Sequence, residues 1–99
     1  MIQIIILLEI DDLNSFREFE TKATGIMKKY DGKVTSAFSP NKNLSTDDNI
    51  GEIHILEFPD MQSFNNYRAD EELKNMKDLR EKAVISTKIY ISEKFVSYE

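Results

Sequence analysis

The chain has no cysteine and no tryptophan, and its 99 residues include one histidine, three glycines and two prolines. Without cysteine there can be no disulfide, thiolate zinc site, iron–sulfur cluster or cysteine nucleophile. A transition-metal site would need mainly carboxylates, and no spacing of acidic residues resembles a calcium-binding loop. The three glycines lie far apart, so no glycine-rich loop can cradle a phosphate. We therefore predict a protein that uses no metal and no cofactor.

Positive charge is also scarce. Thirteen Lys and Arg residues face 18 Asp and Glu residues, which gives a formal net charge of −5. A general nucleic-acid binder needs a basic surface to displace counterions from phosphates, and this charge balance argues against that class. It also disfavours an anionic membrane surface. The apolar run at residues 2–8 is too short to cross a bilayer and lacks the flanks of a signal peptide, so we expect a cytoplasmic protein.

The spacing of apolar residues predicts one domain, residues 1–99, because a chain of this length has room for one core. Short β-branched runs indicate strands, and apolar residues at three- and four-residue spacing indicate helices. The polar, turn-forming run at residues 40–49 is the one clear loop. The predicted strands are residues 2–10, 33–38, 50–58 and 86–95, and the predicted helical segments are residues 13–30 and 60–83.

Polar residues at the ends of the helical segments predict where each one starts and stops. Ser15 with Glu18 fits a capping box, in which each side chain bonds a free backbone N–H of the first turn. Gly32 supplies the stop for the first helix. Asp60 is the expected N-cap of the next helix, and Asp70 the expected cap of a second segment behind it.

The predicted order is β-α-β-β-α-β, an α+β arrangement in which two helices cover one face of a four-stranded antiparallel sheet. In the first strand the even positions are all apolar, whereas the odd positions are apolar only at Ile5 and Leu7. The face without helices therefore presents apolar side chains. Such a face is unusual on a monomer and marks an interface, so we predict a homodimer formed through the open sheet face.

Residues 57–80 carry a pattern that resembles a known family. Glu57-Phe58-Pro59 is followed by Asp60, then by Tyr67, and thirteen residues later by Arg80. The chain is similar to members of the dimeric α/β-barrel superfamily, which has a ferredoxin-like fold and includes the antibiotic-biosynthesis monooxygenase-like proteins. Within it, the resemblance is to a small family of unknown function with a Glu-Phe-Pro-Ser motif, a Trp, a Tyr six residues later, and an Arg thirteen residues after the Trp.

The correspondence is incomplete. Asp60 stands for the family's Ser and Tyr67 for its Trp, while Leu73 occupies the place of its second aromatic residue. No Glu-Gly pair precedes the third strand, although residues 30–33 resemble the family's Tyr-Gly-Gly-Arg. The resemblance implies a homodimer with a pocket between each sheet and its helices, and it implies no agreed chemistry.

Four residues are candidates for a site in that pocket, each with a structural alternative. His54 shares strand parity with Leu56 and faces an apolar side, either as a proton shuttle or as a core histidine satisfied by one hydrogen bond. Arg80 can clamp an anionic group, or it pairs with a nearby acid such as Glu81. Tyr67 either closes the pocket or packs in the core. Tyr90 lines either the pocket or the dimer seam.

These candidates support three functions. The first is a cofactor-independent oxygenase or isomerase acting on a small organic substrate, in which His54 handles protons and Arg80, Tyr67 and Tyr90 bind the substrate. The second is a non-catalytic dimer that holds a metabolite in the same pocket. The third is a structural dimerisation domain with a filled core. A cavity of several hundred Å³ containing His54 or Arg80 favours the first two.

Overall fold

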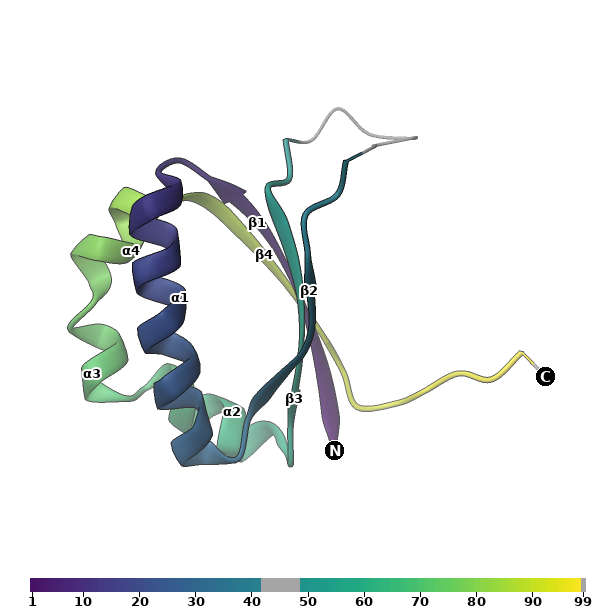
Figure 1. Ribbon diagram of the computed structural model, residues 1–99. Helices are drawn as coiled ribbons and strands as arrows, with labels where there is room; N and C mark the ends of the chain where they lie inside the picture. The colour runs from purple at the N-terminus through teal and green to yellow at the C-terminus, as the bar shows by residue number, and fades with distance from the viewer. Residues whose placement is uncertain (42–48, 99) are drawn as a thin grey trace.

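The computed structural model describes residues 1–41 and 49–98. Four antiparallel strands form one sheet in the order β2-β3-β1-β4, and all helices lie on one face of it (Figure 1). The predicted α+β ferredoxin-like fold is thus confirmed. The elements are β1 Ile2–Ile10, α1 Leu13–Met27, the 3₁₀ helix η1 Lys28–Tyr30, β2 Lys33–Phe38, β3 Glu52–Phe58, α2 Met61–Arg68, α3 Glu71–Lys74, α4 Lys77–Ala83 and β4 Val84–Ser92.

One predicted cap and the boundaries of two predicted strands were wrong. The capping box at Ser15 does not form, because helix α1 starts at Leu13 and the Ser15 hydroxyl donates to the side chain of Asp12 instead. Strand β3 starts at residue 52 rather than 50. Strand β4 runs over residues 84–92 rather than 86–95, since α4 leads directly into it and its pairing with β1 ends at the first residues of that strand. The predicted loop at 40–49 lies, apart from its ends, outside the described residues.

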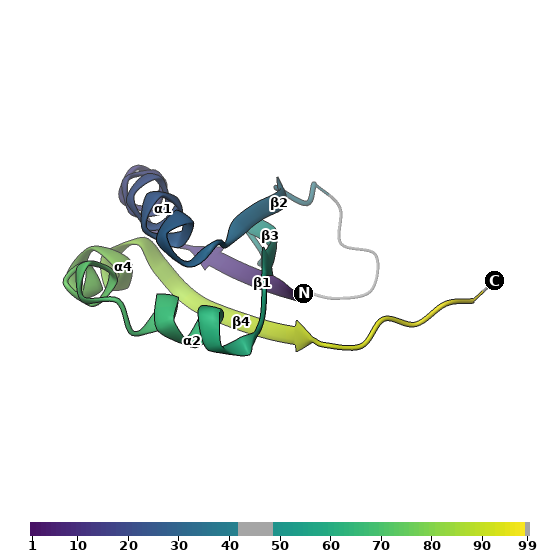
Figure 2. The same cartoon turned by 90° about the horizontal axis from the view of Figure 1, so that it is seen from below.

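The helices form a layer over the sheet, and within the described residues the opposite face of the sheet carries no helix (Figures 1 and 2). Even positions of β1 point toward the helices, where Ile4 is completely buried, whereas Ile5 on the other face is 41% exposed. The predicted alternation is therefore confirmed. No helix in the described part of the chain has the length and apolar character needed to cross a membrane.

Both predicted aspartate caps are confirmed. The Oδ1 atom of Asp60 accepts a hydrogen bond of 2.8 Å from the backbone N–H of Ser63 at the start of α2. The Oδ1 atom of Asp70 accepts bonds from the N–H groups of Glu72 and Leu73, at 2.8 and 3.2 Å. Each carboxylate satisfies donors that have no partner within the first turn of its helix.

Asp70 also ties the helices together. Its Oδ2 atom accepts a hydrogen bond from the Tyr30 hydroxyl and lies 3.2 Å from the Lys29 ammonium, so it links η1 to α3. The hydrogen bond from Tyr30, helped by Lys29 and by the two capped N–H groups, lowers the pKa of Asp70 to about 2. The segment that carries α3 over the sheet is anchored by this network.

Gly32 is needed for a different reason from the one predicted. The residue that reverses the chain after η1 is Asp31, whose φ of 60° is left-handed, while Gly32 has no positive φ. A Cβ atom on Gly32 would lie 2.3 Å from the Phe58 ring and 2.7 Å from Cγ of Met27. Gly32 therefore lets the end of the helical segment approach the buried ring of Phe58 closely.

We predict that Gly32→Ala destabilises the protein by about 1–3 kcal/mol, because the added methyl group must displace a fully buried ring. Gly25→Ala is the matched control, since a Cβ atom at this exposed helical position meets nothing within 4 Å. The control should be neutral or stabilising by up to about 1 kcal/mol. Urea denaturation of both variants measures the difference, and equal effects would contradict the packing role of Gly32.

Candidate functional site

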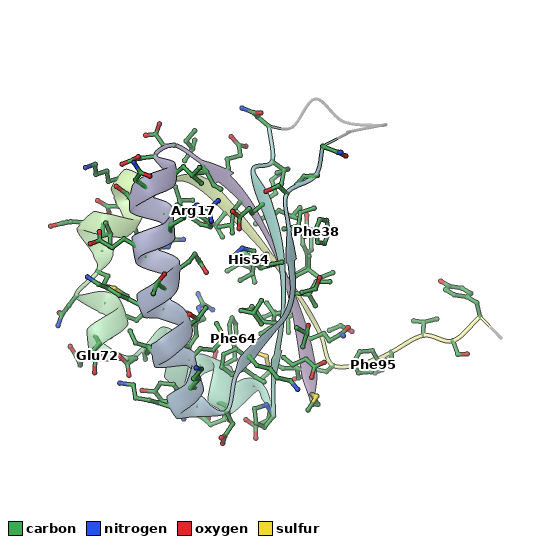
Figure 3. The ribbon with its side chains drawn as sticks, viewed as in Figure 1. Arg17, Phe38, His54, Phe64, Glu72 and Phe95 are labelled. Atoms are coloured by element: carbon green, nitrogen blue, oxygen red, sulfur yellow. The ribbon has the colours of Figure 1, made fainter. Side chains whose placement is uncertain are left out.

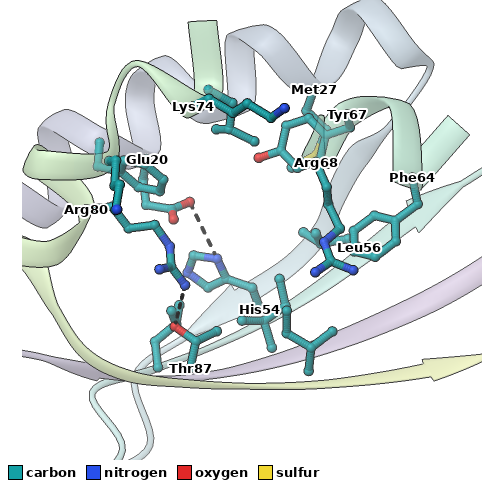
Figure 4. A pocket seen from close by; sticks show the side chains of 16 residues that line it. Glu20, Met27, His54, Leu56, Phe64, Tyr67, Arg68, Lys74, Arg80 and Thr87 are labelled. Carbon is teal, nitrogen blue, oxygen red and sulfur yellow. Dashed lines mark hydrogen bonds and ion pairs between the residues drawn. The ribbon is translucent and has the colours of Figure 1, made fainter. Parts of the chain in front are cut away.

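A cavity of about 500 Å³ lies between the helices and the sheet (Figure 4). Its size is within the range of pockets that hold small organic molecules. Most of its wall is apolar, with Leu8 and Leu56 contributed by the sheet, Phe19 by α1 and Phe64 by α2. The space under the helices is thus not filled by side chains, which disfavours the predicted alternative of a structural domain with a solid core.

His54 reaches this cavity from the middle of β3 and is only 5% exposed. Its side chain points from the sheet toward the helices (Figure 3), as the strand parity predicts. The Nε2 atom lies 2.8 Å from Oε1 of Glu52, and the Nδ1 atom lies 3.6 Å from Oε2 of Glu20. The first contact is a hydrogen bond, and the second is longer than a hydrogen bond.

This geometry selects one tautomer of a neutral His54. A carboxylate only accepts hydrogen bonds, so contact with Glu52 places the proton of the ring on Nε2. The lone pair then resides on Nδ1, on the side of the ring that faces Glu20 and the cavity (Figure 4). Glu52 therefore satisfies the structural need of the buried ring, and it also prepares Nδ1 to accept a proton.

Glu20 and Glu52 are site residues that sequence reasoning missed. Glu52 lies two residues before His54, so both side chains point to the same side of β3. Strand periodicity is therefore enough to find Glu52 from the sequence. Glu20 follows the buried Phe19 on α1, and only the packing of α1 on the sheet reveals that it meets His54. Burial raises the pKa of Glu20 above its ordinary value, the charge of Glu52 raises it further, and His54 opposes both.

Tyr67 and Arg80 also line the cavity. Tyr67 is 9% exposed and packs against Phe58 with ring centroids 5.5 Å apart, so it contributes to the core as well. Burial is the main reason that the pKa of its hydroxyl is raised, so the hydroxyl stays protonated and can donate. Arg80 donates from Nη2 to Oγ1 of Thr87 at 3.2 Å. Within residues 1–41 and 49–98 it forms no ion pair with Glu81, contrary to the alternative considered above.

Tyr90 does not line the cavity, so its assignment as a pocket residue was wrong. In the register between β1 and β4 it is opposite Ile5, on the face without helices, and it is 59% exposed. The neighbouring Ile89 points into the cavity instead. Glu57 likewise has the parity of the open face, opposite Gln3, and cannot act on a molecule in the cavity. Of the four predicted site residues, the structure therefore brings three to the cavity, and these are His54, Tyr67 and Arg80.

Metal ligands do not gather in this region. In the described part of the chain, no three histidine, aspartate or glutamate side chains are grouped so that they could hold a metal ion. The groups that the cavity offers are a histidine base, a tyrosine hydroxyl, one glutamate and several cationic side chains. These groups can bind an organic anion and move protons.

We predict that NMR titration of the Glu20 carboxyl group gives a pKa above that of an ordinary glutamate. Glu52→Gln removes a negative neighbour and should lower this pKa. Glu93→Gln, which removes one charge from the exposed segment after β4, is the control and should leave it unchanged. An ordinary value in every variant would show that Glu20 is not buried beside His54.

The comparisons with known proteins are consistent with this fold. The family profile described as "Domain of unknown function (DUF1330)" matches residues 3–95. No curated protein matches the sequence. A protein of unknown function from Rhodopseudomonas palustris has a similar structure, with a TM-score of 0.83 at 14% identity, covering 97% of this chain and 83% of that one.

Two further structures show the same architecture. A dabb family protein with a ferredoxin-like fold from Mesorhizobium loti gives a TM-score of 0.67 at 14% identity, covering 96% of this chain and 97% of that one. An uncharacterised NIPSNAP domain protein from Burkholderia xenovorans gives a TM-score of 0.71 at 8% identity, covering 96% of this chain and 95% of that one. At these identities the likeness extends to the fold alone.

Proposed function

The chain belongs to the DUF1330 family, and we propose that it binds a small organic molecule beneath its helices and transfers a proton on it, as an isomerase does. The observation that carries this proposal is the buried His54, whose Nε2–H is held by Glu52 while Nδ1 faces the cavity. A carboxylate that fixes the tautomer of a histidine is the usual way to orient a general base.

The reaction class follows from the groups within reach. Nδ1 of His54 takes a proton from a carbon next to a carbonyl group, so a C–H bond breaks and its electron pair moves onto the carbonyl oxygen. The protonated hydroxyl of Tyr67 donates a hydrogen bond to that developing oxyanion. In a substrate with a C=C bond next to that carbon, the electron pair of the dienolate extends to a second carbon, and the histidine returns the proton there as the carbonyl group forms again. These proton transfers need no oxidant, so they favour an isomerase over the oxygenase alternative.

A non-catalytic binding protein is the second candidate, and the mostly apolar wall of the cavity supports it. In that case the pair of His54 and Glu52 is a buried hydrogen bond that stabilises the sheet, and the cavity binds a molecule without changing it. The two candidates differ in one measurable property, which is whether the protein catalyses the exchange of a carbon-bound proton.

We predict that the protein catalyses exchange of α-protons for deuterium in a panel of small keto acids, followed by proton NMR in D₂O. His54→Asn should lower the rate by about 10²–10⁴-fold, because it removes the general base. Glu52→Gln should lower it less, since the base remains but its tautomer is no longer imposed. Tyr90→Phe, on the open face, should retain the rate of the wild type.

Thermal unfolding of each variant shows whether it is folded. A folded His54→Asn variant with an unchanged exchange rate would remove His54 from the mechanism. A wild type that binds a panel member without exchanging its protons would support the non-catalytic candidate instead.

We also propose that two copies of the chain pair through the open faces of their sheets. Ile5 and Phe38 on that face are 41% and 48% exposed. Phe38 lies on the side of the sheet away from the helices (Figure 3). The segment after β4 extends away from the helices (Figure 1) and carries the exposed Phe95 (Figure 3). Apolar side chains gathered in this way favour contact with another protein surface.

Light scattering at micromolar concentration should therefore give twice the 11.5 kDa mass of the chain. Ile5→Lys places a charge in the middle of the open face and should give a folded monomer. Lys22→Gln, which changes the charge of an exposed residue on α1, should remain dimeric. A monomeric wild type at this concentration would contradict pairing through the sheet.

A further inference from the structure

We propose that the ligand of the cavity is a dianion, a short apolar carbon chain with an acidic group at each end. This inference rests on the proposed function, since it names the class of molecule on which His54 would act. It comes from the distribution of charge around the cavity, and in particular from two arginines on different helices, Arg68 and Arg80.

The charge at the cavity is opposite to that of the chain. The protein carries a net charge of −5, yet the described residues that line the cavity include four cationic side chains and a single carboxylate, Glu20. Burial raises the pKa of that carboxyl group, which favours its uncharged form. The cationic side chains belong to α2, α3 and α4, and they are Arg68, Lys74, Lys77 and Arg80.

Among the described residues, the two arginines have no acidic partner. Arg80 donates to the neutral hydroxyl of Thr87, and the guanidinium of Arg68 lies 5.6 Å from the centroid of the Phe64 ring. Neither forms an ion pair within residues 1–41 and 49–98, whereas Lys77 lies 3.8 Å from Glu81. A guanidinium beside an apolar wall is weakly hydrated and presents a fork of donors that matches a carboxylate, so each arginine is ready to bind one.

The arrangement of these groups favours two acidic groups over one. Arg80 enters the cavity from α4 and Arg68 from α2, on opposite sides, and His54 lies between them (Figure 4). Leu56 and Phe64 provide apolar surface near the histidine. A ligand with one acidic group would leave one guanidinium without a counterion. A dicarboxylate can pair one carboxylate with each arginine. Its carbon chain then lies next to His54, which can remove a proton from it.

Isothermal titration calorimetry with straight-chain dicarboxylates from succinate to sebacate tests this inference against monocarboxylates of the same lengths. At the preferred length, the dicarboxylate should bind the wild type about tenfold or more tightly than its monocarboxylate, because it adds a charge-assisted hydrogen-bond pair. Arg68→Gln and Arg80→Gln should each abolish this preference. Arg17→Gln, which removes an arginine of α1 outside the cavity, should retain it.

Equal affinity for dicarboxylates and monocarboxylates in the wild type overturns the inference, as does an unchanged preference in folded Arg68→Gln. His54→Asn separates this result from the proposed function, because it should bind the preferred dicarboxylate within about twofold of the wild type while losing proton exchange. If the wild type exchanges protons but does not prefer dicarboxylates, only the inference of a dianionic ligand is wrong. If the wild type prefers dicarboxylates but exchanges no protons, only the catalytic role of His54 is wrong.

Discussion

The antiparallel pairing of β1 with β3 is the constraint on which the rest of the molecule depends. It places Ile6 opposite His54 on the side of the helices, and Ile5 opposite Ile55 on the open side. Because side chains alternate along a strand, a slip of one residue would turn His54 out of the cavity and bring Ile55 into it. The register therefore fixes both the chemistry beneath the helices and the apolar surface on the other face.

The core on the helix side consists of two hydrophobic clusters, and the candidate site lies between them. One cluster packs Phe58, Phe64 and Tyr67 beneath α2, and a smaller one contains Leu8 and Phe16 near α4, with Ile6 in contact with both. A buried imidazole between two carboxylates costs free energy unless it is hydrogen-bonded, and Glu52 supplies that bond. The aromatic cluster stabilises the fold elsewhere, so the site can keep its polar groups and its empty space.

The sequence predicted what depends on neighbours along the chain. Strand alternation predicted the direction of His54, and the two aspartate caps followed from the residues beside them. The contact of Glu20 with His54 and the positions of Arg68 and Arg80 around one cavity depend on how helices pack, which no local pattern contains. For Tyr90 the sequence allowed the pocket or the dimer seam, because its face depends on the pairing of β4 with β1, and that pairing places it opposite Ile5 on the open face.

The four cationic side chains at the cavity and the Glu20 carboxyl group act together on the charge of a bound ligand. The net negative charge of the protein repels anions, but at physiological ionic strength such repulsion is screened beyond about 8 Å, so a ligand at the cavity responds mainly to the side chains that line it. An ionised Glu20 would oppose an anionic ligand there. Burial raises the pKa of Glu20, and a bound anion would raise it further, so ligand binding and protonation of Glu20 favour each other. The Oε2 atom of Glu20 lies 3.6 Å from Nδ1 of His54, the atom that the proposed reaction uses.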